Sequence, residues 1–152
     1  MGTKVLQVAA LKNGTVIDHI PAEKLFKVFS ILKLEDCKET ITVGNNLTSK
    51  TLSKKGIIKI TDRFFEEDET NKIALIAPNA KINIIKEFEV IEKRPLKLPE
   101  EVKEIVQCPN PACITNHQPV KTWFHTIKDL NENRLKCHYC EREVKIDEVK
   151  IK

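Results

Sequence analysis

Four of the five cysteines form two close pairs in the last third of the chain. Cys108 and Cys113 have the spacing C-x4-C, and Cys137 and Cys140 have the spacing C-x2-C. Zn²⁺ is satisfied by four thiolates in a tetrahedron, and two short cysteine turns can each present two sulfurs to one ion. The chain must leave and return between the turns, which favours a β-hairpin or small sheet there. Four unrelated buried or disulfide-bonded thiols are the alternative.

A site with four cysteine ligands leaves no open position for water or substrate, so the predicted Zn²⁺ is structural. A small polar segment can draw its folding free energy from such a metal, about 10–16 kcal/mol. His138 lies inside the second cysteine turn and is interpreted as a surface residue rather than a ligand. His117 and His125 are assigned no role.

The rest of the sequence indicates a reduced environment. Cys37 lies far from the cluster between charged residues, and an odd thiol argues against a secreted disulfide framework. The N-terminus lacks the apolar core of a signal peptide, and no apolar run approaches the ~18 residues needed to span a bilayer. We therefore expect a soluble cytoplasmic protein with no membrane partner.

Charge is placed unevenly. Residues 1–98 hold 17 Lys and Arg against 13 Asp and Glu, whereas residues 99–152 hold nine of each. The basic excess in the N-terminal part favours an anionic ligand there, and the neutral zinc part disfavours nucleic-acid binding.

Residues 1–98 are predicted to fold as an α+β domain with the order of a ferredoxin-like βαββαβ sandwich, in which two helices cover one face of an antiparallel sheet. Its exposed sheet face or an edge strand would be available for dimerisation. The pattern predicts helices over 22–34 and from the acidic run at 66–69 to Pro78. Strands are predicted at 4–11, 15–20 (a second strand or the first one resuming), 40–47, 57–61, 81–85 and 88–92, the last two forming one strand or a hairpin.

Two prolines in residues 94–99 mark a semi-rigid connector to a second domain over 99–152. This domain is expected to be small, zinc-ribbon-like and all-β, after a short helical turn within 99–106. Residues 121–127 and 134–136 are predicted to be hairpin strands, and the alternating residues 143–151 to close the sheet.

No catalytic constellation stands out, so the chain is not predicted to be an enzyme. Glycine-rich phosphate loops are absent from the sequence, which has four glycines. Taken alone, Lys59 and Lys93 fit solvated surface lysines. The alternatives are a zinc-ribbon nucleic-acid-binding factor, which requires basic, aromatic-bearing strands around the cysteines, and a small zinc enzyme, which requires a ligand other than four thiolates.

Several motifs occur together and in order: GTVIDHIP at 14–21, IIKI at 57–60, APNAKIN at 77–83, and the two cysteine turns. Over nearly the whole chain they resemble the regulatory chain of aspartate carbamoyltransferase. The resemblance implies a non-catalytic subunit of pyrimidine biosynthesis, with an N-terminal allosteric domain that binds nucleoside triphosphates and forms a regulatory-chain homodimer. It also implies a C-terminal zinc domain that docks on trimers of catalytic chains.

Carried over by position, the resemblance implies a nucleotide pocket in the N-terminal domain. CTP would inhibit and ATP would oppose it. Family members often carry Glu where Ala9 stands and Tyr where Phe88 stands, and these departures are expected to alter nucleotide preference or the strength of the response. The implied pocket residues are Ala9, Ala10, Leu11, Val16, Asp18, His19, Lys59, Asn83, Ile85, Val90 and Lys93.

Overall fold

The computed structural model describes residues 10–50 and 53–152. The chain divides into two compact units, Met1–Lys97 and Leu98–Lys152, which we call the N-terminal unit and the C-terminal unit. None of the helices in the described residues has the length and apolarity that a membrane crossing requires.

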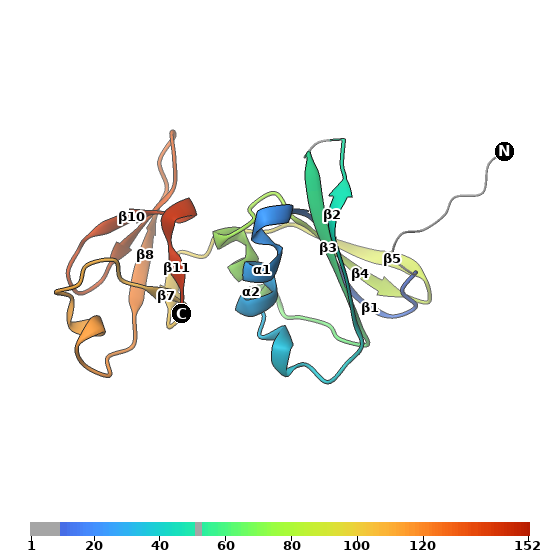
Figure 1. The fold of residues 1–152 in the computed structure, drawn as a ribbon, viewed down its shortest axis with the longest axis horizontal. Helices are drawn as coiled ribbons and strands as arrows, with labels where there is room; N and C mark the ends of the chain where they lie inside the picture. The colour runs from blue at the N-terminus through green and yellow to red at the C-terminus, as the bar shows by residue number, and fades with distance from the viewer. Residues whose placement is uncertain (1–9, 51–52) are drawn as a thin grey trace. The chain divides into compact units, whose positions relative to one another are not determined.

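The described part of the N-terminal unit is an antiparallel sheet of order β2-β3-β1-β4-β5 with both helices on one face (Figure 1). Its first four strands have the ferredoxin-like order, which confirms the predicted α+β class, and β5 is an added edge strand. Residues 81–92 therefore form a hairpin rather than one strand. The elements are β1 (Gly14–Pro21), α1 (Leu25–Ile31), β2 (Ile41–Thr48), β3 (Lys54–Thr61), α2 (Glu67–Asn71), β4 (Lys81–Lys86) and β5 (Glu89–Arg94).

Alternation along the three central strands builds the core of this unit. Successive side chains of a strand point to opposite faces, so alternate residues of β3, β4 and β1 face the helices, except at the irregularity of β1 between Ile17 and Ile20. On that face the strands present isoleucines, against which α1 and the segment after α2 pack their apolar side chains. The buried residues are Ile17, Ile20, Ile58, Ile60, Ile82, Ile84, Leu25, Val28, Ile73 and Leu75.

Both helices are shorter than the sequence pattern predicts. A 3₁₀ turn, Ala22–Lys24, precedes α1, and Lys33 adopts a left-handed conformation (φ 54°) that ends the helical segment. Glu66 and Glu69 form a reciprocal capping box at the start of α2, which continues as a 3₁₀ turn, Lys72–Leu75.

Two strand boundaries also differ from prediction. The predicted strand at 4–11 lies outside the described residues up to residue 9, and Ala10 and Leu11 are not in a strand. The first described strand begins only at Gly14, and β3 begins at Lys54, three residues before its predicted start.

The C-terminal unit is all-β, as predicted, with a four-stranded sheet of order β10-β9-β8-β6 and a two-stranded sheet of order β11-β7. The predicted helical turn at 99–106 is wrong: Val102 pairs with Phe124, and both are buried, so strand pairing satisfies this backbone. Residues 143–151 form two short strands in different sheets. The elements are β6 (Glu101–Lys103), β7 (Val106–Gln107), β8 (Trp123–Ile127), β9 (Arg134–Cys137), β10 (Glu143–Lys145) and β11 (Lys150–Ile151).

Candidate functional site

The four cysteines of the two turns converge in the C-terminal unit. Cys108 follows β7, Cys137 ends β9, and the sulfur atoms of all four residues lie within 4.8 Å of one another. The Sγ atoms of Cys108 and Cys140 are 3.6 Å apart, and those of Cys113 and Cys137 are 3.8 Å apart. Four sulfurs at ~2.3 Å from one Zn²⁺ define a tetrahedron with edges of about 3.8 Å. The observed spacing therefore fits one zinc ion.

Polar contacts hold the first cysteine turn in shape. The Asn116 side-chain amide donates to the carbonyl oxygens of Cys108 (3.1 Å) and Asn110 (2.7 Å), and the Cys113 backbone N–H donates to the Asn110 carbonyl (3.0 Å). The Thr115 hydroxyl donates to the Cys113 sulfur at 3.2 Å. Such outer contacts orient metal ligands and are part of the site.

The protonation of the thiols follows their surroundings. Burial raises the pKa of Cys108 and of Cys137. Partial burial also acts to raise the pKa of Cys140, but hydrogen bonds from the Arg142 backbone N–H and the Asn110 side chain outweigh it and lower that pKa to about 7. Because thiols bind metals as thiolates, loading the site releases protons from the buried cysteines.

The neighbouring histidine is not a ligand in this arrangement. The His138 ring stacks on Trp123, with centroids 3.6 Å apart, and its Nδ1 lies 2.8 Å from His125 Nε2. Four sulfur ligands and no open position make the centre structural rather than catalytic. The fifth cysteine, Cys37, belongs to the other unit and is not in the cluster.

In the N-terminal unit, strand register aligns most of the implied pocket residues on the sheet face opposite the helices. Val16 is directly opposite Lys59 on β3 and Asn83 on β4, and Asn83 is opposite Lys93 on β5. Residues directly opposite one another in antiparallel strands share a face. Lys59 and Lys93 are three strand spacings apart, or about 14 Å. The next row on this face contains Gly14, Ile85 and Val90.

Asp18 lies two residues after Val16 on the same face and is part of a small charged group. Its carboxylate is 3.0 Å from Lys55 Nζ and accepts a 2.7 Å hydrogen bond from the His19 backbone N–H. His19 itself adopts φ 59° where the register of β1 against β3 shifts; among the described residues its buried Nδ1 makes no hydrogen bond, but it lies 3.6 Å from an Asp18 carboxylate oxygen. Burial lowers the pKa of Lys59, and the Asp18 carboxylate partly opposes this effect.

The sequence does not predict Lys55 as a member of this group, because the strand is expected to begin only at residue 57. Lys55 lies in β3, four residues before Lys59, and residues at this spacing in a strand share a face. The spacing of four residues between Lys55 and Lys59 is the sequence signal that would have placed Lys55 in this group.

The remaining implied residues lie before β1 or in the β4–β5 turn. Ala9 is outside the described residues, whereas Ala10 and Leu11 directly precede Lys12, whose carbonyl oxygen accepts a 2.9 Å hydrogen bond from the Phe88 backbone N–H. Phe88 is 64% exposed in this turn. This bond brings the segment before β1 to the end of the sheet that carries Ile85 and Val90.

Comparison with known proteins identifies the family of both units. Residues 6–97 match the family model of the aspartate carbamoyltransferase regulatory chain, allosteric domain, and residues 100–150 match that of its metal binding domain. The chain belongs to the aspartate carbamoyltransferase regulatory chain family. The family assignment and the four-cysteine cluster together establish one structural zinc site in the C-terminal unit.

Curated relatives with the name aspartate carbamoyltransferase regulatory chain cover nearly the whole sequence. The protein from Bacteroides fragilis is 56% identical over 97% of this chain and 96% of its own length. That from Phocaeicola vulgatus is 54% identical over 97% and 95%, and that from Pyrococcus abyssi is 46% identical over 95% of both chains. The family assignment supports a regulatory subunit that associates with catalytic chains.

Proposed function

We propose that this chain is the non-catalytic allosteric subunit of an aspartate carbamoyltransferase in pyrimidine biosynthesis. Its N-terminal unit binds nucleoside triphosphates, with CTP as inhibitor and ATP as activator, and forms a homodimer of regulatory chains. Its C-terminal unit, held together by Zn²⁺, docks on trimers of catalytic chains. The chain has no active site of its own and acts in the cytoplasm. These two functions imply two domains, an allosteric domain of residues 1–98 and a zinc-binding domain of residues 99–152.

One observation supports the nucleotide site above the others: the row of Lys59, Val16, Asn83 and Lys93 across the sheet face opposite the helices. A triphosphate requires cations, and the ammonium of Lys93 is a flexible point charge suited to phosphate oxygens. The ~14 Å between the two lysines leaves room for a ribose and base over Val16 and Asn83.

The ends of the row supply polar groups of different kinds. Asp18, Lys55 and His19 form a charged group beside it, in which the Asp18 carboxylate lies 3.0 Å from Lys55 Nζ and 3.6 Å from His19 Nδ1. Backbone amides and carbonyls of Ala10 and Leu11 can distinguish the exocyclic groups of cytosine and adenine. A carboxylate close to the lysines favours a metal-bound triphosphate over a free one, because the cation offsets the repulsion.

Titration calorimetry on the zinc-loaded chain tests the nucleotide site. We expect Lys93→Ala to weaken CTP binding by about tenfold or more, since a charged hydrogen bond contributes roughly 1.5–3 kcal/mol. Lys27→Ala is the matched control, because Lys27 is an exposed lysine of α1, on the opposite side of the sheet. Equal CTP affinity in both variants and the wild type would contradict the assignment.

A further inference from the structure

Arg94 is the neighbour of Lys93 on β5 and occupies the other face of the sheet. Lys93 pairs with Asn83 on the sheet face opposite the helices, which we call the open face. Arg94 pairs with Ile82, which is buried against the helices. The Arg94 side chain is only 12% exposed. A shift of the β5 backbone at Lys93 therefore also moves the largely covered Arg94 guanidinium on the opposite face.

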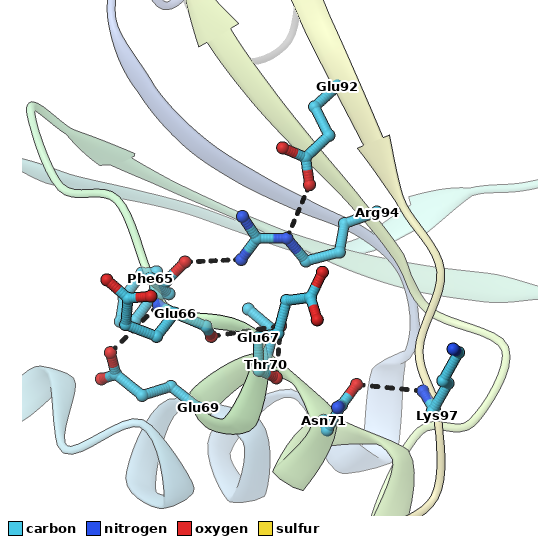
Figure 2. Close-up of polar contacts among 9 residues, drawn as sticks. All are labelled: Phe65, Glu66, Glu67, Glu69, Thr70, Asn71, Glu92, Arg94 and Lys97. Atoms are coloured by element: carbon cyan, nitrogen blue, oxygen red, sulfur yellow. Dashed lines mark hydrogen bonds and ion pairs between the residues drawn. The ribbon is translucent and has the colours of Figure 1, made fainter.

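The guanidinium of Arg94 joins β5 to the segment that leads into α2 (Figure 2). Its Nε lies 2.8 Å from Glu92 Oε2, and its Nη1 donates to the carbonyl oxygen of Phe65. Phe65 is buried and lies four residues after β3 ends at Thr61, so this bond connects the strand of Lys93 with the exit from the strand of Lys59.

A second contact ties the last residue of the N-terminal unit to the end of α2. The Lys97 backbone N–H donates to the Asn71 side-chain oxygen at 3.0 Å (Figure 2). At its beginning, α2 is closed by the capping box of Glu66 and Glu69. The helix is thus held at one end by Arg94, through Phe65, and at the other by Lys97. We call these two contacts the α2 latch.

The strand that carries Lys93 has the features of an element that can shift. Among the described strands β5 lies at the edge of the sheet and pairs with β4 alone, and this pairing is irregular between Ile84 and Ile85. Every residue of β5 before Arg94 is exposed. Few buried contacts and an edge position are the features of elements that shift at low free-energy cost.

We propose that the α2 latch is the positioning element that converts nucleotide binding on the open face into a change at Lys97, where the chain leaves the N-terminal unit. This inference rests on the proposed nucleotide site. A triphosphate held by Lys59 and Lys93 fixes β5 relative to β3, and Arg94 transmits that position to α2. Asn71 then sets where the Lys97 backbone lies. Arg94 and Asn71 are positioning residues, since neither lies on the open face.

The effect of the α2 latch on regulation can be measured separately from the affinity for the nucleotide. A nucleotide that binds two states of an assembly equally shifts neither, however tightly it binds. Loss of the latch therefore removes the difference in nucleotide affinity between the two states and leaves the intrinsic affinity in place. Loss of Lys93 instead weakens nucleotide binding to both states.

The test uses the chain assembled with aspartate carbamoyltransferase catalytic chains. Two quantities are measured: the Kd of CTP with and without a ligand in the catalytic site, and the effect of saturating CTP on the catalytic rate. For the wild type we expect the two Kd values to differ within the usual range of about 5- to 150-fold. For Asn71→Ala and Arg94→Gln we expect the two values to converge to within about twofold and the saturating effect to disappear.

Two further variants separate positioning from general destabilisation. Asn71→Asp keeps the side-chain oxygen that accepts from Lys97 and should restore the response, which a merely structural defect of the variant chain would not predict. Lys93→Ala should raise both Kd values and also bring them closer together, because the triphosphate then no longer holds β5. A full response in Asn71→Ala and Arg94→Gln would overturn the latch. Absence of CTP binding by the wild type would instead overturn the proposed function on which it rests.

Discussion

Substitution of Cys137 by alanine should unfold the C-terminal unit and leave the N-terminal unit intact. Cys137 is fully buried, and its sulfur lies 3.8 Å from that of Cys113 in the four-sulfur cluster. Structural zinc in small domains contributes about 10–16 kcal/mol of folding free energy. The C-terminal unit spans Leu98–Lys152, and at 0.05–0.15 kcal/mol per residue a domain of that length has roughly 3–8 kcal/mol of net stability. The loss of the metal therefore exceeds the whole stability of the unit.

The chain contains a convenient probe for this experiment. Trp123 is its sole tryptophan and lies in the C-terminal unit, stacked on His138. We expect the zinc-loaded wild type to show a cooperative change in Trp123 fluorescence on urea addition, and Cys137→Ala to show the unfolded signal without urea. Circular dichroism should still report a cooperative transition from the N-terminal unit. Cys37→Ala is the control, because Cys37 is outside the cluster. If Cys137→Ala without bound metal showed the same cooperative change in Trp123 fluorescence as the wild type, the reasoning would be refuted.

Two further predictions concern the N-terminal unit. Gly14 has φ 144°, and a Cβ there would overlap the carbonyl oxygen of Ile60, so Gly14→Ala should lower the urea midpoint of this unit. The control variant Ala10→Gly, at an exposed position before β1, should change the midpoint little. Equal midpoints for Gly14→Ala and the wild type would contradict the packing. Burial lowers the pKa of Lys59 in the free chain, and a bound triphosphate favours its ammonium form, so CTP binding at alkaline pH should take up protons and weaken as pH rises. Calorimetry in buffers of different ionisation enthalpy should detect this uptake in the wild type and find less in Lys59→Gln; equal uptake in both would contradict the role of Lys59.

Of all the features of the structure, the metal centre is the one that the sequence predicts best. Cysteine spacing alone indicates which four residues meet, because the ligand geometry of zinc is fixed by the ion and not by the rest of the fold. The isoleucine alternation of β1, β3 and β4 likewise reveals a sheet with one covered face, since the period of a strand is two whatever its neighbours are.

Errors occur where tertiary contacts decide the local structure. Residues 99–106 have a helix-like sequence, yet Val102 pairs with Phe124, and the partner strand overrides local propensity. The helix predicted to continue to residue 34 ends because Lys33 takes a left-handed conformation that its residue type does not signal.

The residues aligned on the open face show a different limit of prediction from sequence. No local pattern places Val16, Lys59, Asn83 and Lys93 together, because their alignment depends on the register of four strands. Resemblance to a family brought these residues to attention, and the register gives the physical reason why they can act together. The contact that Arg94 makes could not be predicted from the sequence, since its partner is a backbone carbonyl 29 residues away.

The central claim is that an anionic nucleotide bound by the N-terminal unit changes the activity of catalytic chains held by the zinc-stabilised C-terminal unit. Its most direct test is the initial rate of purified aspartate carbamoyltransferase catalytic chains, mixed with the zinc-loaded chain and titrated with CTP. We predict a saturable fall in rate that disappears when the regulatory chain carries Cys137→Ala. A rate that is the same with and without CTP, in a complex that demonstrably contains both chains, would contradict the claim.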